Sequence, residues 1–197
     1  MQKKVNVRFM AVTAILAAVA TVLMYLDFSV PLVPGFLKMD LSEFPALLAS
    51  FSMGPVSGIV VCLLKNVFHL LHTSTSGAGE LANFLLGVCF VLPAGLLYKK
   101  HRTFKGAVTA AVVGTVAMAV LSLPVNLLIS YPAYTLFYGL STEAILGMYQ
   151  VFLPWVSQLW QALVIFNVPF TLVKGLLSVL VTFLLYKRLS PIIKGSN

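Results

Sequence analysis

The run GAVTAAVVGTVAMAVLSLPVNLLI at residues 106–129 contains no charged residue and directly follows a basic cluster at residues 99–105. An α-helix rises 1.5 Å per residue, so about 20 apolar residues cross the hydrocarbon core of a bilayer. Further apolar runs predict five more helices, at residues 9–26, 41–53, 55–71, 81–98 and 166–186. The sequence therefore predicts an all-α integral membrane protein with six transmembrane helices in a single domain, residues 1–197.

The overall composition excludes an ordinary water-soluble domain. Hydrophobic residues make up 60% of the chain and charged residues only 9%, whereas soluble domains carry roughly 25% charged residues. The net charge of +8 does not indicate a nucleic-acid-binding protein, because such a protein needs many exposed basic side chains on one folded face. The expected environment is a lipid bilayer. Most basic residues form three short clusters: Lys3, Lys4 and Arg8; Lys99, Lys100, Arg102 and Lys105; and Lys187, Arg188 and Lys194.

The basic clusters also predict the orientation of the chain. Basic segments flanking transmembrane helices are enriched on the cytoplasmic side, so both termini and the turn at residues 99–105 are expected there. The chain between residues 8 and 99 must then cross the membrane an even number of times, which retains the short run 41–53 as a helix. By the same count, segment 131–160, rich in Tyr and Trp, stays outside as a long loop with an interfacial helix.

Polar side chains within the apolar runs predict a ligand pocket. Ionisable residues inside a membrane usually face the bundle interior or a cavity, because their transfer into lipid is costly. On the last helix they recur at i, i+4, i+7 and i+11, along one face. Four such stripes together predict an outward-facing pocket for a neutral, planar or polyhydroxyl solute. They are Asn167, Thr171, Lys174 and Ser178; Thr115, Ser122, Asn126 and Ser130; Lys65, Asn66, His69 and His72; and Glu80 with Asn83.

Structural alternatives remain open for the members of these stripes. Lys65, His69 or Lys174 could pair with Glu80, and the Asn side chains could form interhelical hydrogen bonds. His69, His72 and Glu80 could instead hold a metal ion in a membrane-embedded enzyme, but two His without a third ligand nearby in sequence are a weak signature. We therefore expect no metal ion, no catalytic residue and no cofactor.

The segment at residues 27–40 is unusual for a loop outside the membrane. Pro31, Pro34 and Gly35 interrupt a series of residues that is otherwise largely apolar. Exposed apolar side chains need a surface to cover. The segment either forms a lid over the pocket or docks onto the outer leaflet.

The chain has no obvious means of driving transport by itself. It has no GxxxxGK[ST] phosphate loop for ATP hydrolysis, and no paired broken helices in an inverted repeat, which mark many secondary transporters. A separate partner would then supply the energy. Ala14 and Ala18 lie on a small-residue face of the first helix that allows a partner helix to approach closely, although the same face could serve internal packing.

Five motif groups resemble one known family over nearly the whole chain. They are FLKMD at 36–40 with FPAL at 44–47; GP at 54–55 with LKN at 64–66; GAGELANF at 77–84; Asn126 with YPAY at 131–134; and PFTLVKG at 169–175. In these motifs the chain resembles the riboflavin-specific S components of energy-coupling factor (ECF) vitamin transporters. The resemblance implies a six-helix, high-affinity substrate-binding subunit in the plasma membrane of a prokaryote.

The resemblance also implies partners and residue roles. A transmembrane coupling protein would contact Ala14 and Ala18, and two ATPase subunits would drive it. Riboflavin would be the transported ligand, its isoalloxazine ring held by Asn126, Lys174 and a polar residue ahead of that lysine. The family usually has Asn at the position of Thr171, so either Thr171 or Asn167, one turn earlier, would make this contact.

Other residues complete the expected pocket. Leu37 and Met39 would cover the ring, and Glu80 with Asn83 would lie near the ribityl chain or brace the pocket. The whole expected ligand-binding set is Leu37, Met39, Asp40, Lys65, Asn66, Glu80, Asn83, Asn126, Asn167, Thr171 and Lys174.

Two other functions remain open at this point. The same architecture could bind another vitamin, and the chain could be a stand-alone secondary transporter. A phosphate would need additional positive charge near the pocket mouth, and only Lys38 is an obvious candidate there. Free riboflavin is therefore expected to be preferred over its phosphate.

Overall fold

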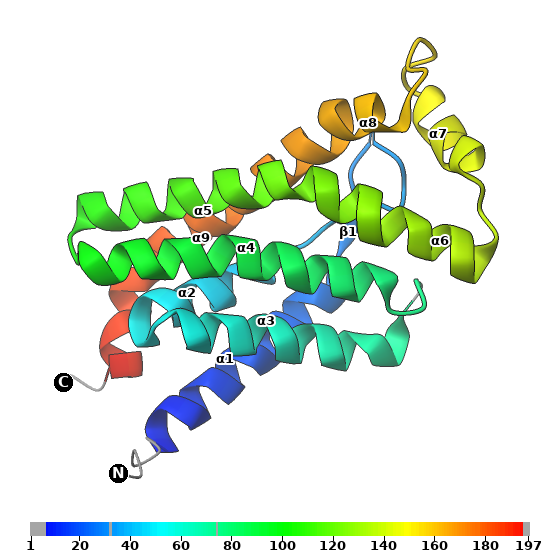
Figure 1. Cartoon of the computed structure of the whole chain (residues 1–197). Helices are drawn as coiled ribbons and strands as arrows, with labels where there is room; N and C mark the ends of the chain where they lie inside the picture. The colour runs from blue at the N-terminus through cyan, green and yellow to red at the C-terminus, as the bar shows by residue number, and fades with distance from the viewer. Residues whose placement is uncertain (1–6, 32, 74, 195–197) are drawn as a thin grey trace.

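The computed structural model describes residues 7–31, 33–73 and 75–194, which are almost entirely helical (Figure 1). The elements in chain order are α1 (Val7–Tyr25), strands β1 (Phe28–Ser29) and β2 (Lys38–Met39), α2 (Glu43–Met53), α3 (Pro55–His69), α4 (Ala78–Lys100), α5 (Phe104–Val125), α6 (Tyr131–Tyr138), α7 (Thr142–Gln150), α8 (Leu159–Ala162) and α9 (Val168–Lys194). A 3-10 turn, Leu70–His72, extends α3. The π-helical turns Asn126–Ser130 and Leu163–Asn167 join α5 to α6 and α8 to α9.

Five helical segments of the described chain are long and apolar enough to cross a membrane. They are Val7–Tyr25, Pro55–His72, Ala78–Lys100, Phe104–Tyr138 and Leu159–Tyr186. The prediction of a helical, multi-pass membrane protein is therefore supported, but the count of six transmembrane helices is not confirmed.

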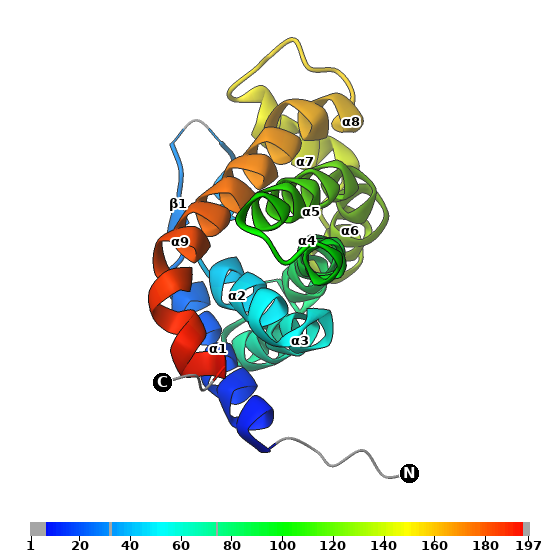
Figure 2. The ribbon, with the colours of Figure 1, turned by 90° about the vertical axis from the view of Figure 1, so that its left-hand side faces the viewer.

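The sixth expected helix corresponds to α2, which has only 11 residues. At 1.5 Å per residue such a helix is roughly 16 Å long, about half of a hydrocarbon core. Every residue from Glu43 to Phe51 is buried, and α2 packs against α1, α3, α4 and α9 (Figure 2). The chain reverses after α2 at Gly54, whose φ of 108° favours glycine.

The helices flanking the expected outer loop are longer than the sequence runs indicated. The fifth run was expected to end at residue 129, but helical structure continues through a π-helical turn to Tyr138. The last run begins at Leu159 and not at residue 166. Pro132 does not stop the helix, because it lies in the first turn of α6, where its missing N–H is tolerated. The loop expected at 131–160 is thus reduced to residues 139–158, which include α7.

The two ends of the bundle differ in structure. The start of α1, the α4–α5 turn and the end of α9 lie at one end, whereas the strand hairpin, α6 and α7 lie toward the other (Figure 1). This arrangement agrees with the expectation that all three basic segments are on the same side. Lys3 and Lys4 of the first cluster lie outside the described residues.

The buried apolar side chains form two clusters. The larger core lies among α1 to α5 and includes Leu47, Val61 and Phe90. A smaller core around Tyr149, Leu163 and Phe166 holds α7 against the start of the last transmembrane segment. The smaller core supports the loops that enclose the cavity described below.

Close contact between α4 and α5 depends on Gly114. A Cβ at this position would lie 2.5 Å from the backbone oxygen of Phe90 and 3.0 Å from Cβ of Ala94. We expect Gly114→Ala to destabilise the protein by about 1–3 kcal/mol, the usual cost of overpacking a tight contact. Thermal unfolding in detergent, followed by circular dichroism, measures this loss.

Gly147→Ala is the matched control, because no atom lies within 4 Å of a Cβ at Gly147 in helix α7. This variant should be as stable as the wild type or slightly more stable, since Ala favours helix. Equal stability of the Gly114→Ala and Gly147→Ala variants would show that α4 and α5 do not pack as described.

Candidate ligand-binding site

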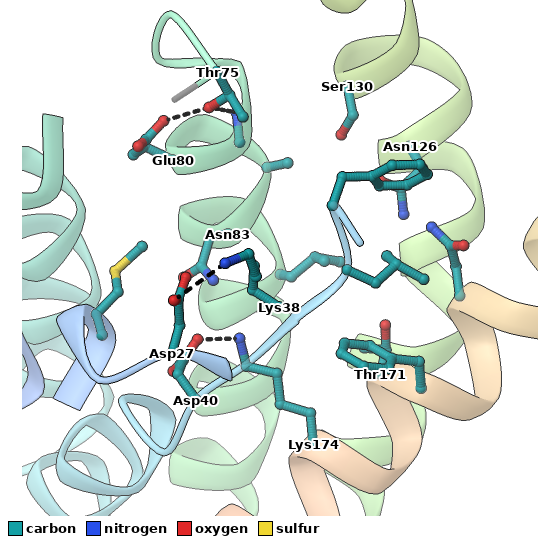
Figure 3. Close-up of a pocket in the computed structure, with 18 of the residues that line it drawn as sticks. Asp27, Lys38, Asp40, Thr75, Glu80, Asn83, Asn126, Ser130, Thr171 and Lys174 are labelled. Atoms are coloured by element: carbon teal, nitrogen blue, oxygen red, sulfur yellow. Dashed lines mark hydrogen bonds and ion pairs between the residues drawn. The ribbon is translucent and has the colours of Figure 1, made fainter. Parts of the chain in front are cut away.

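A cavity of about 440 Å³ opens between the strand hairpin, α4, α6 and α9 (Figure 3). Its volume falls within the roughly 300–1,000 Å³ of typical small-molecule sites. Eight of the eleven expected ligand-binding residues line it: Leu37, Asp40, Glu80, Asn83, Asn126, Asn167, Thr171 and Lys174. Tertiary folding thus brings three of the four polar stripes to one cavity, with His69 contributing from the fourth.

An ion pair between Lys174 and Asp40 lies in the cavity wall. Lys174 Nζ donates to Asp40 Oδ2 at 2.7 Å, and the backbone N–H of Ser42 donates to Asp40 Oδ1 at 2.8 Å. Burial tends to raise the pKa of Asp40, but the ammonium groups of Lys174 and Lys65 outweigh it and lower the pKa to about 2. Asp40 therefore remains a carboxylate at neutral pH, and Lys174 has a fixed counter-ion.

Lys65 and Asn66 do not line the cavity, contrary to their assignment from the sequence. Lys65 is completely buried behind the wall, where its ammonium group donates to Glu43 Oε1 at 2.5 Å and to Ser42 Oγ at 2.7 Å. Asn66 Nδ2 donates to the carbonyl oxygen of Cys62 at 2.8 Å. A buried ammonium group needs a carboxylate, and Glu43 is the nearest one to Lys65.

Glu43 was missed by the sequence analysis although it lines the cavity and is only 1% exposed. Its carboxylate is engaged by Lys65, and α2 begins at this residue. The available signal was an acidic residue within a run expected to be transmembrane, which predicts a buried partner or a cavity.

Glu80 forms a second polar group at the rim of the cavity. His69 Nδ1 lies 2.8 Å from Glu80 Oε1, while the hydroxyls of Thr73 and Thr75 donate to Oε2 at 3.0 and 2.9 Å. Among the three partners considered for Glu80, the structure selects His69 over Lys65 and Lys174. Glu80 is thus fixed at the start of α4, one helical turn before Asn83 (Figure 3).

Asn167 and Thr171 both line the cavity but differ in their hydrogen bonds. The Asn167 side chain accepts from the Tyr149 hydroxyl at 2.7 Å and donates to the Tyr131 hydroxyl at 3.2 Å, and these hydroxyls also contact each other. Within the described chain, the Thr171 hydroxyl has no hydrogen-bond partner. Thr171 is therefore the freer of the two to meet a ligand.

The C-terminal end of α5 contributes a further amide. Asn126 begins the π-helical turn, and its Nδ2 donates to the backbone oxygen of Ser122 at 2.8 Å. A π-helical turn widens the helix and is frequent at functional sites. The turn places Asn126 in the cavity wall opposite Lys174 (Figure 3).

The segment at residues 27–40 contributes several residues to the lining of the cavity. Phe36 and Leu37 line it, and the Phe36 ring contacts those of Tyr131 and Tyr149 edge to face, at centroid distances of 6.4 and 5.6 Å. Met39 was expected to cover a ligand, but it is buried in β2, outside the cavity lining. Side chains alternate along a strand, so Met39 points away from the side of Lys38 and Asp40.

Helix α1 has small residues on both its exposed and its buried side. Ala14 and Ala18 are exposed, whereas Ala17 and Ala20 are buried against the bundle. One set of small residues on this helix is therefore used for internal packing, and the other set is exposed.

No group of three or more His, Cys, Asp and Glu side chains that could hold a metal ion occurs within residues 7–31, 33–73 and 75–194. Glu80 meets His69 and two threonines, which is a hydrogen-bonded carboxylate and not a metal ligand set.

Comparisons with known proteins point to one family. The model of the ECF transporter substrate-specific component matches residues 8–186. The Staphylococcus aureus protein named riboflavin transporter RibU is 33% identical over 181 residues, covering 92% of this chain and 89% of that protein. The Bacillus subtilis protein named riboflavin transporter FmnP is 35% identical over 189 residues, covering 94% of each chain.

A solved structure, described as the S component of a bacterial ECF transporter, has the same fold. It superimposes with a TM-score of 0.73 at 31% identity, covering 94% of this chain and 97% of the other. These relatives are named as transporters and not as enzymes, in agreement with the expectation of no catalytic residue. The chain is a multi-pass membrane protein that belongs to the substrate-specific (S) components of ECF transporters.

Proposed function

We propose that this chain is the riboflavin-binding subunit of an ATP-driven vitamin importer. The observation that carries the proposal is a cavity that combines amide, hydroxyl and ammonium groups with an apolar lid. Riboflavin needs both kinds of surface, because it has a flat ring with an apolar edge, a polar pyrimidine edge and a hydroxyl chain. The names of the relatives from S. aureus and B. subtilis support the same ligand.

Asn126, Thr171 and Lys174 are the proposed partners of the pyrimidine edge. They face one cavity from the outer end of α5 and from α9. An Asn side chain both donates and accepts, a Thr hydroxyl does the same, and an ammonium group only donates. This combination suits the alternating carbonyl and N–H groups of the ring, while Phe36 and Leu37 pack on its apolar part.

Glu80 and Asn83 are the proposed partners of the ribityl chain. Both line the cavity at the start of α4. A carboxylate accepts hydrogen bonds from hydroxyl groups, and an amide can both donate and accept. The existing contacts of Glu80 with two threonine hydroxyls support its capacity to bind hydroxyl hydrogens.

The charges of the cavity favour free riboflavin over its phosphate. Lys174 pairs with Asp40, and Lys38 pairs with Asp27 at 3.5 Å. Glu43 pairs with Lys65 and Glu80 with His69, so the carboxylates of the lining already engage the nearby basic groups. A phosphate entering this cavity would meet more carboxylates than unpaired cations, which disfavours its binding.

Energy is proposed to come from separate chains, with residues 1–197 acting as one transmembrane substrate-binding domain. The exposed face at Ala14 and Ala18 suits close approach by a helix of the transmembrane coupling protein, which two ATPase subunits would drive. With the basic segments in the cytoplasm, both termini are cytoplasmic and the cavity opens outward.

The first prediction concerns the ligand and the pocket. Purified protein should show a flavin absorption band or quench the fluorescence of added riboflavin. Lys174→Ala should weaken binding about 10- to 100-fold, because a hydrogen bond to a charged group contributes about 1.5–3 kcal/mol. Asn126→Ala should weaken binding less, because the amide that it removes is a neutral donor and acceptor.

Two controls accompany this measurement. Lys100→Ala removes the same type of charge at the other end of α4 and should leave binding unchanged. Lys174→Ala leaves the carboxylate of Asp40 without its partner, which could by itself disturb the fold. The double variant Lys174→Met/Asp40→Asn removes both charges, so weak riboflavin binding in this variant reports the lost ligand contact and not misfolding. A colourless protein that does not quench riboflavin fluorescence would indicate an S component for another vitamin.

The second prediction distinguishes Thr171 from Asn167. Thr171→Ala should raise the Kd for riboflavin about two- to tenfold at nearly unchanged Tm, in line with a net contribution of about 0.5–1.5 kcal/mol for a neutral hydrogen bond. Thr171→Ser should retain affinity, because it keeps the hydroxyl. Titration of riboflavin fluorescence measures the Kd of each variant.

Asn167→Ala should mainly lower Tm, because it leaves the buried hydroxyls of Tyr131 and Tyr149 without their amide partner. The opposite result, a large loss of affinity in Asn167→Ala with no effect in Thr171→Ala, would make Asn167 the contact residue.

The third prediction concerns the partner face of α1. The double variant Ala14→Leu/Ala18→Leu should bind riboflavin like the wild type but lose association with the coupling protein and ATP-dependent uptake. Larger side chains would prevent close helix approach. Copurification and uptake into vesicles containing the whole transporter measure both effects.

Ile15→Leu is the control for this face, because Ile15 is also exposed on α1 but is already large. Retained association in the double variant would exclude this face as the contact. Riboflavin uptake by vesicles that contain this chain without ATPases would support a stand-alone secondary transporter instead.

A further inference from the structure

A second cavity, of about 230 Å³, lies at the opposite end of the bundle, where the α4–α5 turn meets α2 and α9. Figure 1 shows this turn far from the hairpin and α6, which enclose the first cavity. The lining consists of Phe51, Tyr98, Arg102, Thr103, Phe104, Ala107, Phe183 and Tyr186. None of these residues takes part in the proposed riboflavin site.

The wall of the second cavity is mainly aromatic. The ring centroids of Phe51 and Tyr98 are 4.7 Å apart, and those of Phe104 and Phe183 are 5.8 Å apart. The hydroxyls of Tyr98 and Tyr186 lie 3.2 Å from each other, so each tyrosine directs its polar tip to the other. Phe104 is 72% exposed. Such a surface accepts an apolar chain and offers few hydrogen bonds to a polar solute.

The mouth of this cavity carries a concentrated positive charge. Arg102 is part of the wall, and Lys99, Lys100 and Lys105 are exposed in the same short segment. The five acidic side chains of the sequence lie elsewhere. Asp27, Asp40, Glu43 and Glu80 line the first cavity, and Glu143 lies in the first turn of α7. No acidic side chain of the chain thus neutralises this end, which leaves it to an external anion.

Helix α5 begins at the same place and adds to the attraction for an anion. Thr103 caps α5, its hydroxyl accepting from the backbone N–H of Gly106 at 3.0 Å. The helix then runs for 22 residues, so its N-terminus carries the positive end of a long dipole beside Arg102.

We propose that this cavity binds an anionic phospholipid from the surrounding leaflet. An acyl chain lies between the aromatic rings, and the phosphate group meets Arg102 at the start of α5. An amphiphile fits both halves of the site, since the rings need an apolar chain and the basic mouth needs an anion. The site lies at the ends of apolar helices, the level at which headgroups meet basic residues.

The test measures lipid stabilisation in detergent. Protein is mixed with phosphatidylglycerol or with phosphatidylcholine of the same acyl chains, and Tm is recorded. Phosphatidylglycerol is expected to raise Tm by a few degrees more than phosphatidylcholine, because a ligand that binds the native state stabilises it. In Arg102→Glu most of this difference is lost, and native mass spectrometry shows loss of a retained lipid.

Lys105→Glu is the matched control, because it reverses the same charge in the same segment but lies outside the cavity lining. This variant keeps most of the difference between the two lipids. Ala107→Leu places a larger side chain in the cavity from its buried wall. This variant should therefore also lose most of the Tm difference between the two lipids. The Tm and the circular dichroism spectrum of each variant without added lipid show whether its fold is intact.

Two results would overturn the lipid site. Equal stabilisation by both lipids would show that the headgroup charge does not matter. An equal loss of the Tm difference in Arg102→Glu and Lys105→Glu would show that it arises from the general surface charge and not from this cavity. Absence of any lipid effect, together with lost copurification of the coupling protein in Arg102→Glu, would assign the cavity to a protein partner. Neither result depends on whether riboflavin binds.

Discussion

The ion pair between Lys174 and Asp40 is the interaction on which the arrangement of the cavity depends. An ammonium group within a membrane-spanning helix requires a counter-ion, and Asp40 supplies it from a segment 134 residues away in sequence. To reach Lys174, the chain after α1 must enter the bundle. The segment that contains β1 and β2 then lies beside the cavity, and its residues Phe36 and Leu37 become part of the lining.

A second buried pair fixes the start of α2 within the bundle. Glu43 and Lys65 are both almost inaccessible, and Lys65 also donates to Ser42, whose backbone N–H binds Asp40. The two pairs therefore form one hydrogen-bonded group that joins α2, α3 and α9. Removal of one member would leave an unpaired buried charge, which typically costs about 3–5 kcal/mol. Helix α2 holds these charges inside the bundle, enclosed by α1, α3, α4 and α9.

The two ends of the bundle divide the charges between them. Four of the five acidic side chains line the first cavity, and their partners are Lys38, Lys65, His69 and Lys174. The fifth, Glu143, lies in α7, so the basic residues of the α4–α5 turn have no acidic side chain beside them. One end thus suits a neutral solute and the other an anion. The Tyr131, Tyr149 and Asn167 group closes the first end by fixing α6 and α7 to the last transmembrane segment.

The sequence by itself determined the apolar runs, the common end of the basic clusters and the helix faces that carry polar residues, because hydropathy and helical periodicity are local properties. Eight of eleven expected site residues line the cavity for this reason. Only the tertiary structure decided that Lys65 pairs with Glu43, that Met39 faces away, and that α2 is too short to be a confirmed span. Periodicity predicts on which face of a helix a residue lies, but it does not predict which side chain the residue contacts. The position of a buried charged side chain depends on a partner of opposite charge, and only the fold brings that partner close.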